Sequence, residues 1–177
     1  MARQINKENF LDASYDVFNK FHKQLAVLTV GTGDDFRCMT IGWGAMGNVW
    51  GHPGSTLTVY VNPLRYTFEY LQQQDHFTVC FFPEEYRKDV LTLGSKSGRD
   101  CDKVALTSLT PKALENGVGF EEAELTFVCK KIYADQFKLE LTPDFVRDGI
   151  YSKFPPHWFY IGSVEDVFGT ATNKEEA

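Results

Sequence analysis

Strand-like segments follow one another near the start of the chain with no helix between them, and this succession constrains the fold more than any other feature. Residues 25–30, 37–42 and 56–61 are rich in β-branched and apolar side chains. Glycine and aspartate residues at 31–35 mark a turn between the first two segments. A parallel sheet would show regular alternation of strands and helices, so the sequence indicates a fold that begins as largely β structure.

Helices are predicted at a few places around these strands. Aromatic residues recur at helical spacing between residues 10 and 21, which predicts a short amphipathic helix. Asn62 and Pro63 form a helix-start signal, because asparagine is a good cap and proline suits the first helical position. Pro83 begins a third helix, and a brief one is expected near residues 103–109.

The rest of the chain predicts three more strands. Residues 77–82 are typical of a buried strand, and residues 157–167 of a final one. Between them, residues 123–130 alternate apolar and polar side chains, which indicates one buried and one solvent-exposed face. Residues 142–154 fit either a helix or an irregular excursion. We therefore predict a mainly β fold with peripheral α structure, in which a small antiparallel barrel carries short helices on its outside.

The composition fits one domain and excludes some partners. The 177 residues are 43% apolar and contain no linker or repeat, so we predict a single domain spanning residues 1–177. The net charge is -6 and no basic stripe is present, which argues against a nucleic-acid partner. The apolar runs are too short to cross a bilayer and the first residues lack a secretory signal, so we expect a cytoplasmic protein without a membrane partner.

The cysteines and histidines do not form a metal-binding pattern. Successive cysteines are more than twenty positions apart, and the four histidines are similarly scattered. We expect no metal site, and we expect the cysteines to be free, buried thiols.

Two glycine-rich stretches match known motifs by letter but not by context. Residues 42–47 spell the dinucleotide-binding glycine pattern, yet residues 48–54 lead into another strand instead of a helix. Residues 94–98 fit neither a nucleophile elbow nor a phosphate loop. The serine lies one position away from where the elbow motif requires it, and the Lys-Ser pair lacks the upstream glycine that the phosphate loop requires. A Rossmann site and a serine hydrolase are both disfavoured.

Three stretches together suit a phosphorylated, flat, aromatic ligand. Arg65 and Thr67 fall in the first turn of the second predicted helix, where unpaired amides also attract a phosphate, although both could be ordinary exposed residues. Glycines beside Thr40 and Trp43 would let a planar ring lie against the backbone, although this stretch could also be a barrel strand with a bulge. The loop at residues 95–100 contains two hydroxyls and two cations that could contact such a ligand. The alternative is that this loop is an ordinary exposed connection.

The order of several motifs resembles the flavin reductase-like, FMN-binding split-barrel family, including its flavoredoxin-like members. The motifs are Met39-Thr40-Ile41-Gly42-Trp43-Gly44, Pro63-Leu64-Arg65-Tyr66-Thr67, Phe81-Phe82-Pro83-Glu84-Glu85-Tyr86, Gly94-Ser95-Lys96-Ser97-Gly98-Arg99-Asp100, Asp102-Lys103, Phe120-Glu121-Glu122-Ala123-Glu124-Leu125 and Tyr160-Ile161-Gly162. The resemblance covers the chain from about residue 18 to residue 168. It implies a six-stranded antiparallel FMN-binding split barrel with short outer helices, a homodimer, and FMN held non-covalently near the dimer interface.

The resemblance also implies roles for individual residues. Met39, Thr40, Ile41 and Trp43 would border the isoalloxazine ring, Arg65 and Thr67 would bind the phosphate, and Ser95, Ser97, Gly98, Arg99 and Lys103 would close the pocket. Leu64 stands where many relatives carry serine, so one phosphate contact is missing. His157 precedes the last strand, as in relatives, and either approaches the ring or the nicotinamide or is a structural, hydrogen-bonded histidine.

By this resemblance the chain is expected to be an FMN-dependent oxidoreductase. NADH or NADPH would pass hydride to flavin N5, and the electrons would go on to a small-molecule or protein acceptor. Lys103 or Arg99, or main-chain donors, would stabilise negative charge near flavin N1 and the C2 oxygen. The sequence shows no nucleophile or acid–base pair, which agrees with this chemistry. Two alternatives stay open: an FMN-carrying electron-transfer protein reduced by a protein donor, and a barrel that binds a ligand without turnover.

Overall fold

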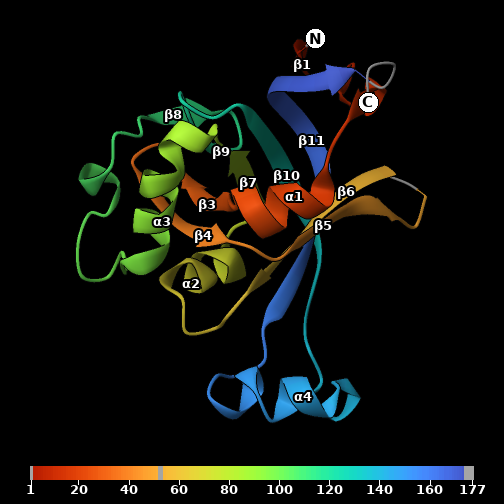
Figure 1. The fold of residues 1–177 in the computed structure, drawn as a ribbon, viewed down its shortest axis with the longest axis vertical. Coiled ribbons are helices and arrows are strands. Elements are labelled where there is room, and N and C mark those ends of the chain that lie inside the picture. The colour runs from red at the N-terminus through yellow and green to blue at the C-terminus, as the bar shows by residue number, and fades with distance from the viewer. Residues whose placement is uncertain (1, 52–53, 174–177) are drawn as a thin grey trace.

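One antiparallel sheet organises the protein, for which the computed structural model describes residues 2–51 and 54–173. Seven strands follow the path β4-β3-β7-β10-β11-β6-β5, and β11 also pairs with β1 and β2. The strands are β1 (Ala2–Ile5), β2 (Ala13–Ser14), β3 (Ala26–Thr32), β4 (Asp35–Ile41), β5 (Gly44–Val49), β6 (Gly54–Val61), β7 (His76–Phe81), β10 (Leu125–Gln136) and β11 (Trp158–Asn173). The sheet curves round on itself, as Figure 1 shows.

Apolar side chains fill the inside of this curved sheet. Tyr160, Phe77 and Phe81 are the largest fully buried ones, and smaller aliphatic side chains from β3, β6 and β10 pack among them. Strands β4 and β6 lie close together but are not hydrogen-bonded neighbours in the described sheet. The barrel is therefore split along this line, and a cavity lined by residues of both strands opens near it.

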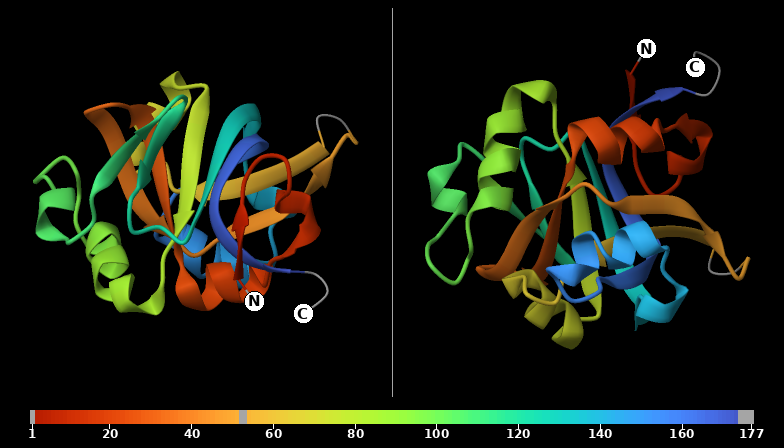
Figure 2. Two further views of the ribbon diagram at one scale, coloured as in Figure 1. Left: turned by 90° about the horizontal axis from the view of Figure 1, so that it is seen from above. Right: turned by 60° about the horizontal axis from the view of Figure 1, so that its bottom comes forward.

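Two helices and a hairpin pack on the outside. Helix α2 (Tyr66–Gln73) lies against β3 and β4, and α3 (Arg87–Ser95) lies against β4 (Figure 2). The hairpin of β8 (Pro111–Leu114) and β9 (Gly117–Phe120) lies over β3 and β7. A second apolar cluster forms between these outer elements and the sheet, and it includes Val27, Cys38, Cys80, Phe82, Val90, Leu93, Leu109 and Phe120.

The remaining helical segments are short. They are α1 (Val17–Asn19), α4 (Asp144–Arg147), a π-helical turn at Lys20–Gln24, and 3-10 turns at Phe10–Asp12, Glu84–Tyr86, Val104–Leu106, Leu139–Leu141 and Ile150–Ser152. The connection between β10 and β11 carries α4 and projects away from the barrel in Figure 1. Within residues 2–51 and 54–173, no helix is long and apolar enough to cross a membrane.

The predicted mainly β, antiparallel barrel with outer helices is confirmed, but the strand number is wrong. The main sheet has nine strands where six were implied, and a separate two-stranded sheet adds to it. The extra strands are β1, β2 and β5 of the main sheet and the two strands of the β8–β9 hairpin. Glycine-rich or very short segments of this kind carry weak strand signals, which explains why the sequence did not predict them.

The predicted amphipathic helix between residues 10 and 21 is also wrong. The segment breaks into a 3-10 turn, the strand β2 and the short helix α1. Strand β2 pairs with the end of β11, and the side chain of Asp16 caps a new helix by accepting a hydrogen bond from the Asn19 amide. Tertiary pairing and this cap therefore override the helical spacing of the aromatic residues.

The alternation in residues 123–130 does not produce a solvent-exposed face on β10. Five successive residues, 125–129, are buried. The outer hairpin covers this part of the sheet, because the hydroxyls of Thr29 and Thr78 both donate to the Val118 carbonyl of β9. Polar residues on the covered face are paired with each other, as in the hydrogen bond from Thr126 to the Cys80 sulfur.

Helix α2 begins three residues later than Pro63. The Asn62 side chain accepts a hydrogen bond from the Leu64 amide at 3.0 Å, and the Asn62 carbonyl accepts one from Arg65. These bonds close a turn before the helix, so Asn62 is not the cap. Arg65 itself occupies the N-cap position, with extended backbone angles. The cation predicted for phosphate binding therefore precedes the first helical turn.

Candidate functional site

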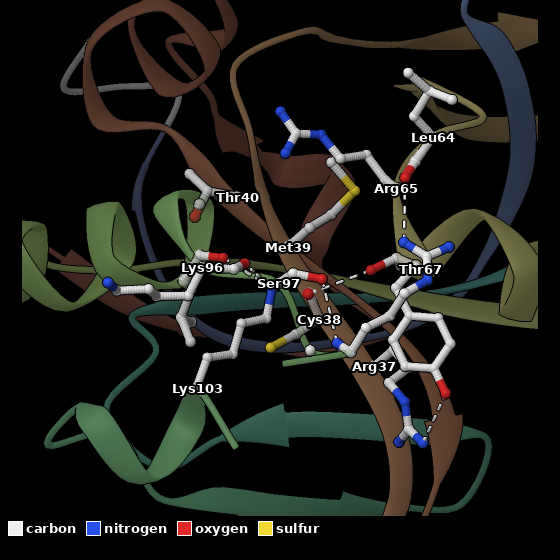
Figure 3. A pocket seen from close by; sticks show the side chains of 15 residues that line it. Arg37, Cys38, Met39, Thr40, Leu64, Arg65, Thr67, Lys96, Ser97 and Lys103 are labelled. Carbon is white, nitrogen blue, oxygen red and sulfur yellow. Dashed lines mark hydrogen bonds between the residues drawn. The ribbon is translucent and has the colours of Figure 1, made fainter. Parts of the chain in front are cut away.

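A cavity of about 150 Å³ lies between β4, the start of α2 and the loop that follows α3 (Figure 3). We call it the basic cavity, because five of its lining residues are cationic. Its lining residues are Arg37, Cys38, Met39, Thr40, Leu64, Arg65, Tyr66, Thr67, Leu93, Gly94, Lys96, Ser97, Gly98, Arg99 and Lys103. No carboxylate is among them, so this small cavity is suited to an anion.

The cations of the basic cavity differ in how far they are neutralised. Arg99 forms an ion pair with Glu69, and Arg37 forms one with Asp35 at 3.4 Å. The side chain of Arg65 has no hydrogen-bond or ion-pair partner in the described part of the chain. The Lys96 ammonium likewise has no partner among the described residues, so Arg65 and Lys96 are the cations most available to a ligand.

The start of α2 adds backbone donors to the basic cavity. The first amides of a helix have no carbonyl partner within it, and they attract anions. Thr67 lies in this first turn and is 2% exposed, and its hydroxyl donates to the Cys38 carbonyl at 3.2 Å. The Thr67 hydroxyl, which was predicted to bind the phosphate, therefore attaches α2 to β4. The donor that Thr67 can offer to a ligand is its backbone amide.

Lys103 holds the loop that closes the basic cavity. Its ammonium donates to the carbonyls of Leu93 at 2.8 Å and of Lys96 at 3.4 Å, and Figure 3 shows the side chain reaching toward Lys96. Burial, followed by the positive charge of Arg65, lowers the pKa of Lys103, and the nearby Cys38 opposes this effect. Lys103 thus lines the cavity, two of its donors bind backbone carbonyls, and its contact with a flavin stays a prediction.

A second cavity, of about 350 Å³, adjoins the basic one. It shares Met39, Thr40, Leu64 and Arg65 with the basic cavity, and its other lining residues are Gly42, Trp43, Tyr60, Asn62, Ile150, Phe154 and His157. We call it the aromatic cavity. Trp43 and His157 are in ring contact there, with centroids 4.6 Å apart. Arg65 belongs to both cavities, so an anionic group and a flat ring could be held on either side of it.

His157 is a partly buried ring with an unsatisfied nitrogen. Its Nδ1 atom is buried and has no hydrogen-bond partner in the described residues. Burial, followed by the charge of Arg65, lowers the pKa of His157 below its ordinary value. The structural role predicted as one alternative rested on a hydrogen-bonded ring, and Nδ1 does not provide it. His157 lines the aromatic cavity, and its approach to a flavin ring or nicotinamide stays a prediction.

Two residues predicted to border the ring make other contacts in the structure. The Thr40 hydroxyl donates to the Val90 carbonyl and so attaches β4 to α3, although Thr40 lines both cavities. Ile41 is 4% exposed, belongs to the core and lines neither cavity. Met39 and Trp43 line cavities, and their contact with the isoalloxazine ring stays a prediction.

The glycines of this strand are required by the core rather than by a ligand. A Cβ atom added at Gly44 would overlap the ring of Phe21, and one added at Gly42 would lie 3.1 Å from the Leu25 side chain. Close packing of the π-helical turn therefore accounts for the bare backbone here. Gly42 also lines the aromatic cavity, and its place beside a flavin ring stays a prediction.

The loop after α3 contributes three of its predicted residues. Ser97, Gly98 and Arg99 line the basic cavity, whereas Ser95 is the last residue of α3 and its hydroxyl donates to the Thr92 carbonyl. Ser95 does not line the cavity. The Arg99 guanidinium is held above the Tyr66 ring, 4.8 Å from its centroid, and also donates to the Leu64 carbonyl.

Sequence reasoning missed several lining residues. They are Arg37, Cys38, Tyr66, Leu93, Gly94 and Lys96 in the basic cavity and Tyr60, Asn62, Ile150 and Phe154 in the aromatic one. Arg37 could have been predicted from the sequence, because it lies two residues before Met39 on the same strand and therefore points to the same side of the sheet. The sequence gives no sign that Tyr60, Ile150 and Phe154 line the same cavity, since only the fold brings the β10–β11 connection to β6.

Comparison with known proteins agrees with this geometry. The family model described as "Flavin reductase like domain" matches residues 18–176. Similar solved structures include a flavoredoxin from Methanosarcina acetivorans (20% identity, 82% of this chain and 68% of that one, TM-score 0.63). They also include an FMN-binding protein from Thermus thermophilus (21% identity, 82% and 69%, TM-score 0.63) and the flavin reductase PheA2 (15% identity, 93% and 88%, TM-score 0.60).

A comparison with curated proteins finds no significant match. These solved structures are only 15–21% identical to the chain, so they establish its fold alone. The family match spans residues 18–176, which is most of the chain. The chain belongs to the flavin reductase-like family of FMN-binding split-barrel proteins.

Proposed function

We propose that this protein is an FMN-binding oxidoreductase of the flavin reductase type, which takes hydride from NADH or NADPH. The observation that carries the proposal is the junction of two cavities at Arg65, one basic and one aromatic. A flavin mononucleotide has the matching division, with a phosphate at one end and a flat ring system at the other. Neither cavity alone would distinguish this ligand from a simple anion or an aromatic compound.

The residues fit each part of FMN. Arg65, Lys96 and the first amides of α2 would bind the phosphate, since charge-assisted hydrogen bonds to a dianion are stronger than neutral ones. Trp43, Tyr60 and Phe154 would surround the ring, and their apolar faces would exclude water from it. Leu64 is exposed at the edge of both cavities and offers no hydroxyl, so the phosphate would depend more heavily on Arg65.

When bound, FMN would supply the hydride chemistry, and the protein would position the ring and shape its surroundings. His157 would present its neutral ring at the aromatic cavity, beside the bound flavin. Lys103 and Arg99 are weaker choices for stabilising charge on the ring. Lys103 donates to two carbonyls, and Arg99 is paired with Glu69.

A second function is an FMN-carrying electron-transfer protein that is reduced by a protein donor. It is favoured by the similarity to the flavoredoxin from Methanosarcina acetivorans and to the flavoredoxin of Desulfovibrio vulgaris. Exposed aromatic side chains near the aromatic cavity, such as Trp43, would provide a short path for electrons. Both functions share the same flavin site and differ in the electron donor.

Anaerobic stopped-flow mixing separates the two functions. The FMN-loaded protein is mixed with NADH and, separately, with NADPH, and the flavin absorbance band is followed. A flavin reductase should bleach with at least one of the two nucleotides. A band that bleaches with dithionite but with neither nucleotide would contradict the reductase and favour the electron carrier.

We also propose that the protein is a homodimer. A groove of about 870 Å³ beside the aromatic cavity is lined by apolar side chains that include Phe18, Phe21, Met46, Phe137 and Val146. Phe18 is 89% exposed in the single chain, and large exposed apolar patches mark interaction surfaces. The groove shares Trp43 and Tyr60 with the aromatic cavity, so a second copy there would lie next to the flavin. Light scattering of the FMN-loaded protein should give a dimer mass, and a monomer mass would contradict this. A cytoplasmic location stays a prediction.

A further inference from the structure

Arg99 joins the loop after α3 to helix α2 across one side of the basic cavity. Its guanidinium pairs with Glu69 of α2 and donates to the Leu64 carbonyl at 3.3 Å. The two side chains of this ion pair are 43% and 50% exposed. Exposed pairs contribute little to stability, and salt screens them. These polar contacts alone would hold the loop only weakly.

The Tyr66 ring, in the first turn of α2, gives the loop a further attachment. Its centroid lies 4.8 Å from the guanidinium carbon of Arg99 and 5.0 Å from that of Arg37. Both distances are within the range of roughly 6 Å for cation–π attraction. A Cβ atom added at Gly98 would lie 3.5 Å from the edge of the same ring, so the loop backbone lies close to it as well. One half-buried ring therefore connects α2, β4 and the loop.

Arg37 is itself fixed on β4 and supports the Tyr66 ring. The Arg37 guanidinium donates to the Phe36 carbonyl at 2.6 Å, pairs with Asp35 at 3.4 Å and lies 4.6 Å from the Tyr70 ring centroid. Its hydrogen bond to the Tyr66 hydroxyl is long, at 3.5 Å. The ring of Tyr66, rather than its hydroxyl, is therefore the group that makes the main contacts.

We propose that Tyr66 is a positioning residue that keeps the Ser97–Arg99 segment closed on the basic cavity and so slows the release of FMN. The inference rests on the proposed function, because FMN is the ligand whose release is slowed. Tyr66 acts by fixing the Arg99 guanidinium and the loop backbone, and not by contact with the flavin. FMN is then retained from one turnover to the next.

The rate of FMN release measures this role. FMN-loaded protein is diluted far below its dissociation constant, and the recovery of free-flavin fluorescence gives the dissociation rate. Tyr66→Leu should release FMN at least about fivefold faster, because the ring contacts with both guanidiniums are lost. Tyr66→Phe keeps the ring and should stay within about twofold of the unmodified protein. Equal release from Tyr66→Leu and Tyr66→Phe would overturn the proposal.

Tyr70→Leu is the matched control, because it removes an aromatic ring one turn further along α2. Tyr70 contacts Arg37, has no ring contact with Arg99 among the described residues, and lines neither the basic nor the aromatic cavity. Its loss should change the release rate by less than about twofold. Release from Tyr70→Leu as fast as from Tyr66→Leu would assign the effect to a loosened helix and contradict the proposal.

A double-mutant cycle with Arg99→Met separates positioning from direct contact with the flavin. If Tyr66 acts through Arg99, adding Tyr66→Leu to Arg99→Met should accelerate release by less than about twofold. A further acceleration of about fivefold would show that Tyr66 contacts FMN itself, and the proposal would be wrong. If the unmodified protein binds no FMN, the proposed function fails instead, so the two failures are distinguishable.

Hydrogen exchange reports on the loop directly. In the FMN-loaded protein, the amides of residues 97–101 should exchange at least about threefold faster in Tyr66→Leu than in Tyr70→Leu, because only the first variant frees the loop. The same exchange rates in both variants would contradict a role for Tyr66 in closing the loop.

Discussion

At the scale of single residues, Arg65 and His157 show how one charge can act on both parts of the site. Arg65 contributes to the lowered pKa values of His157 in the aromatic cavity and of Lys103 in the basic one. Burial is the larger cause in both cases. A ligand phosphate at Arg65 would offset its positive charge. Binding should therefore raise both pKa values toward their ordinary range.

The histidine gives a prediction about pH. The folded chain has a lowered pKa at His157, so the unfolded chain takes up this proton at a higher pH. Stability is then retained above the ordinary histidine pKa of about 6.5 and is lost as the pH falls through the folded value. Urea unfolding should show a loss of stability as the pH falls below about 6.5, with a smaller loss in His157→Gln. An identical pH dependence in both proteins would contradict this.

A second residue-scale prediction concerns the glycines of β5. Gly44→Ala would force a methyl group against Phe21 and should lower the free energy of unfolding by about 1–3 kcal/mol. Gly47→Ala is the matched control, because nothing lies within 4 Å of the added carbon. Urea denaturation of both variants measures the difference. Similar stabilities would show that Phe21 does not require the glycine.

At the scale of elements, the site depends on how α3 and its following loop are attached to β4. The Thr40 hydroxyl bonds to one turn of α3, and a Cβ added at Gly94 would lie 2.9 Å from the Thr40 side chain. Lys103 then ties the end of the helix and the next loop residue together. These contacts fix the Ser97–Arg99 part of the basic cavity before any ligand binds.

Lys103 provides the corresponding prediction. Lys103→Met removes two charge-assisted hydrogen bonds and should cost about 1.5–3 kcal/mol of stability while weakening FMN at least about tenfold. Lys88→Met removes the same charge from an exposed position of α3 and should change stability by less than about 0.5 kcal/mol. Thermal unfolding and flavin titration are the measurements. Equal effects from the two variants would show that Lys103 acts only as a charge.

The elements that the sequence predicted are those with strong local patterns. The apolar runs of β3, β6 and β7 and the helices α2 and α3 were all recognisable. The failures at β2 and on the outer face of β10 come from partners far away in the chain, β11 and the β8–β9 hairpin. Local spacing carries no information about such partners. The predicted start of α2 was wrong for a more local reason, because Asn62 closes a turn before the helix begins.

The same division holds for the site residues. Arg65, Met39, Trp43 and the Ser97–Arg99 segment were predicted and line cavities. Ile41 and Ser95 were predicted from the resemblance and do not, because one belongs to the core and the other to α3. Sequence alone could not show that hydroxyls such as those of Thr40 and Thr67 are used to hold elements together.

At the scale of the whole molecule, the split in the barrel allows cavities to form on its surface rather than inside it. The interior is filled by aromatic and aliphatic side chains. A flavin would therefore lie between the barrel, the outer helices and the projecting β10–β11 connection, which contributes Ile150, Phe154 and, at its end, His157. The barrel supplies a rigid support, and the connections supply the chemistry.

The central claim is that the basic cavity binds the phosphate of a flavin through Arg65, and titration of the apo protein with FMN and with riboflavin tests it most directly. Arg65→Ala should weaken FMN about 10–100-fold, because it removes a charge-assisted contact, and should change riboflavin less than about twofold. Arg147→Ala is the charge-matched control, since Arg147 lines none of the cavities described. An equal loss of affinity for FMN and riboflavin in Arg65→Ala would contradict the claim.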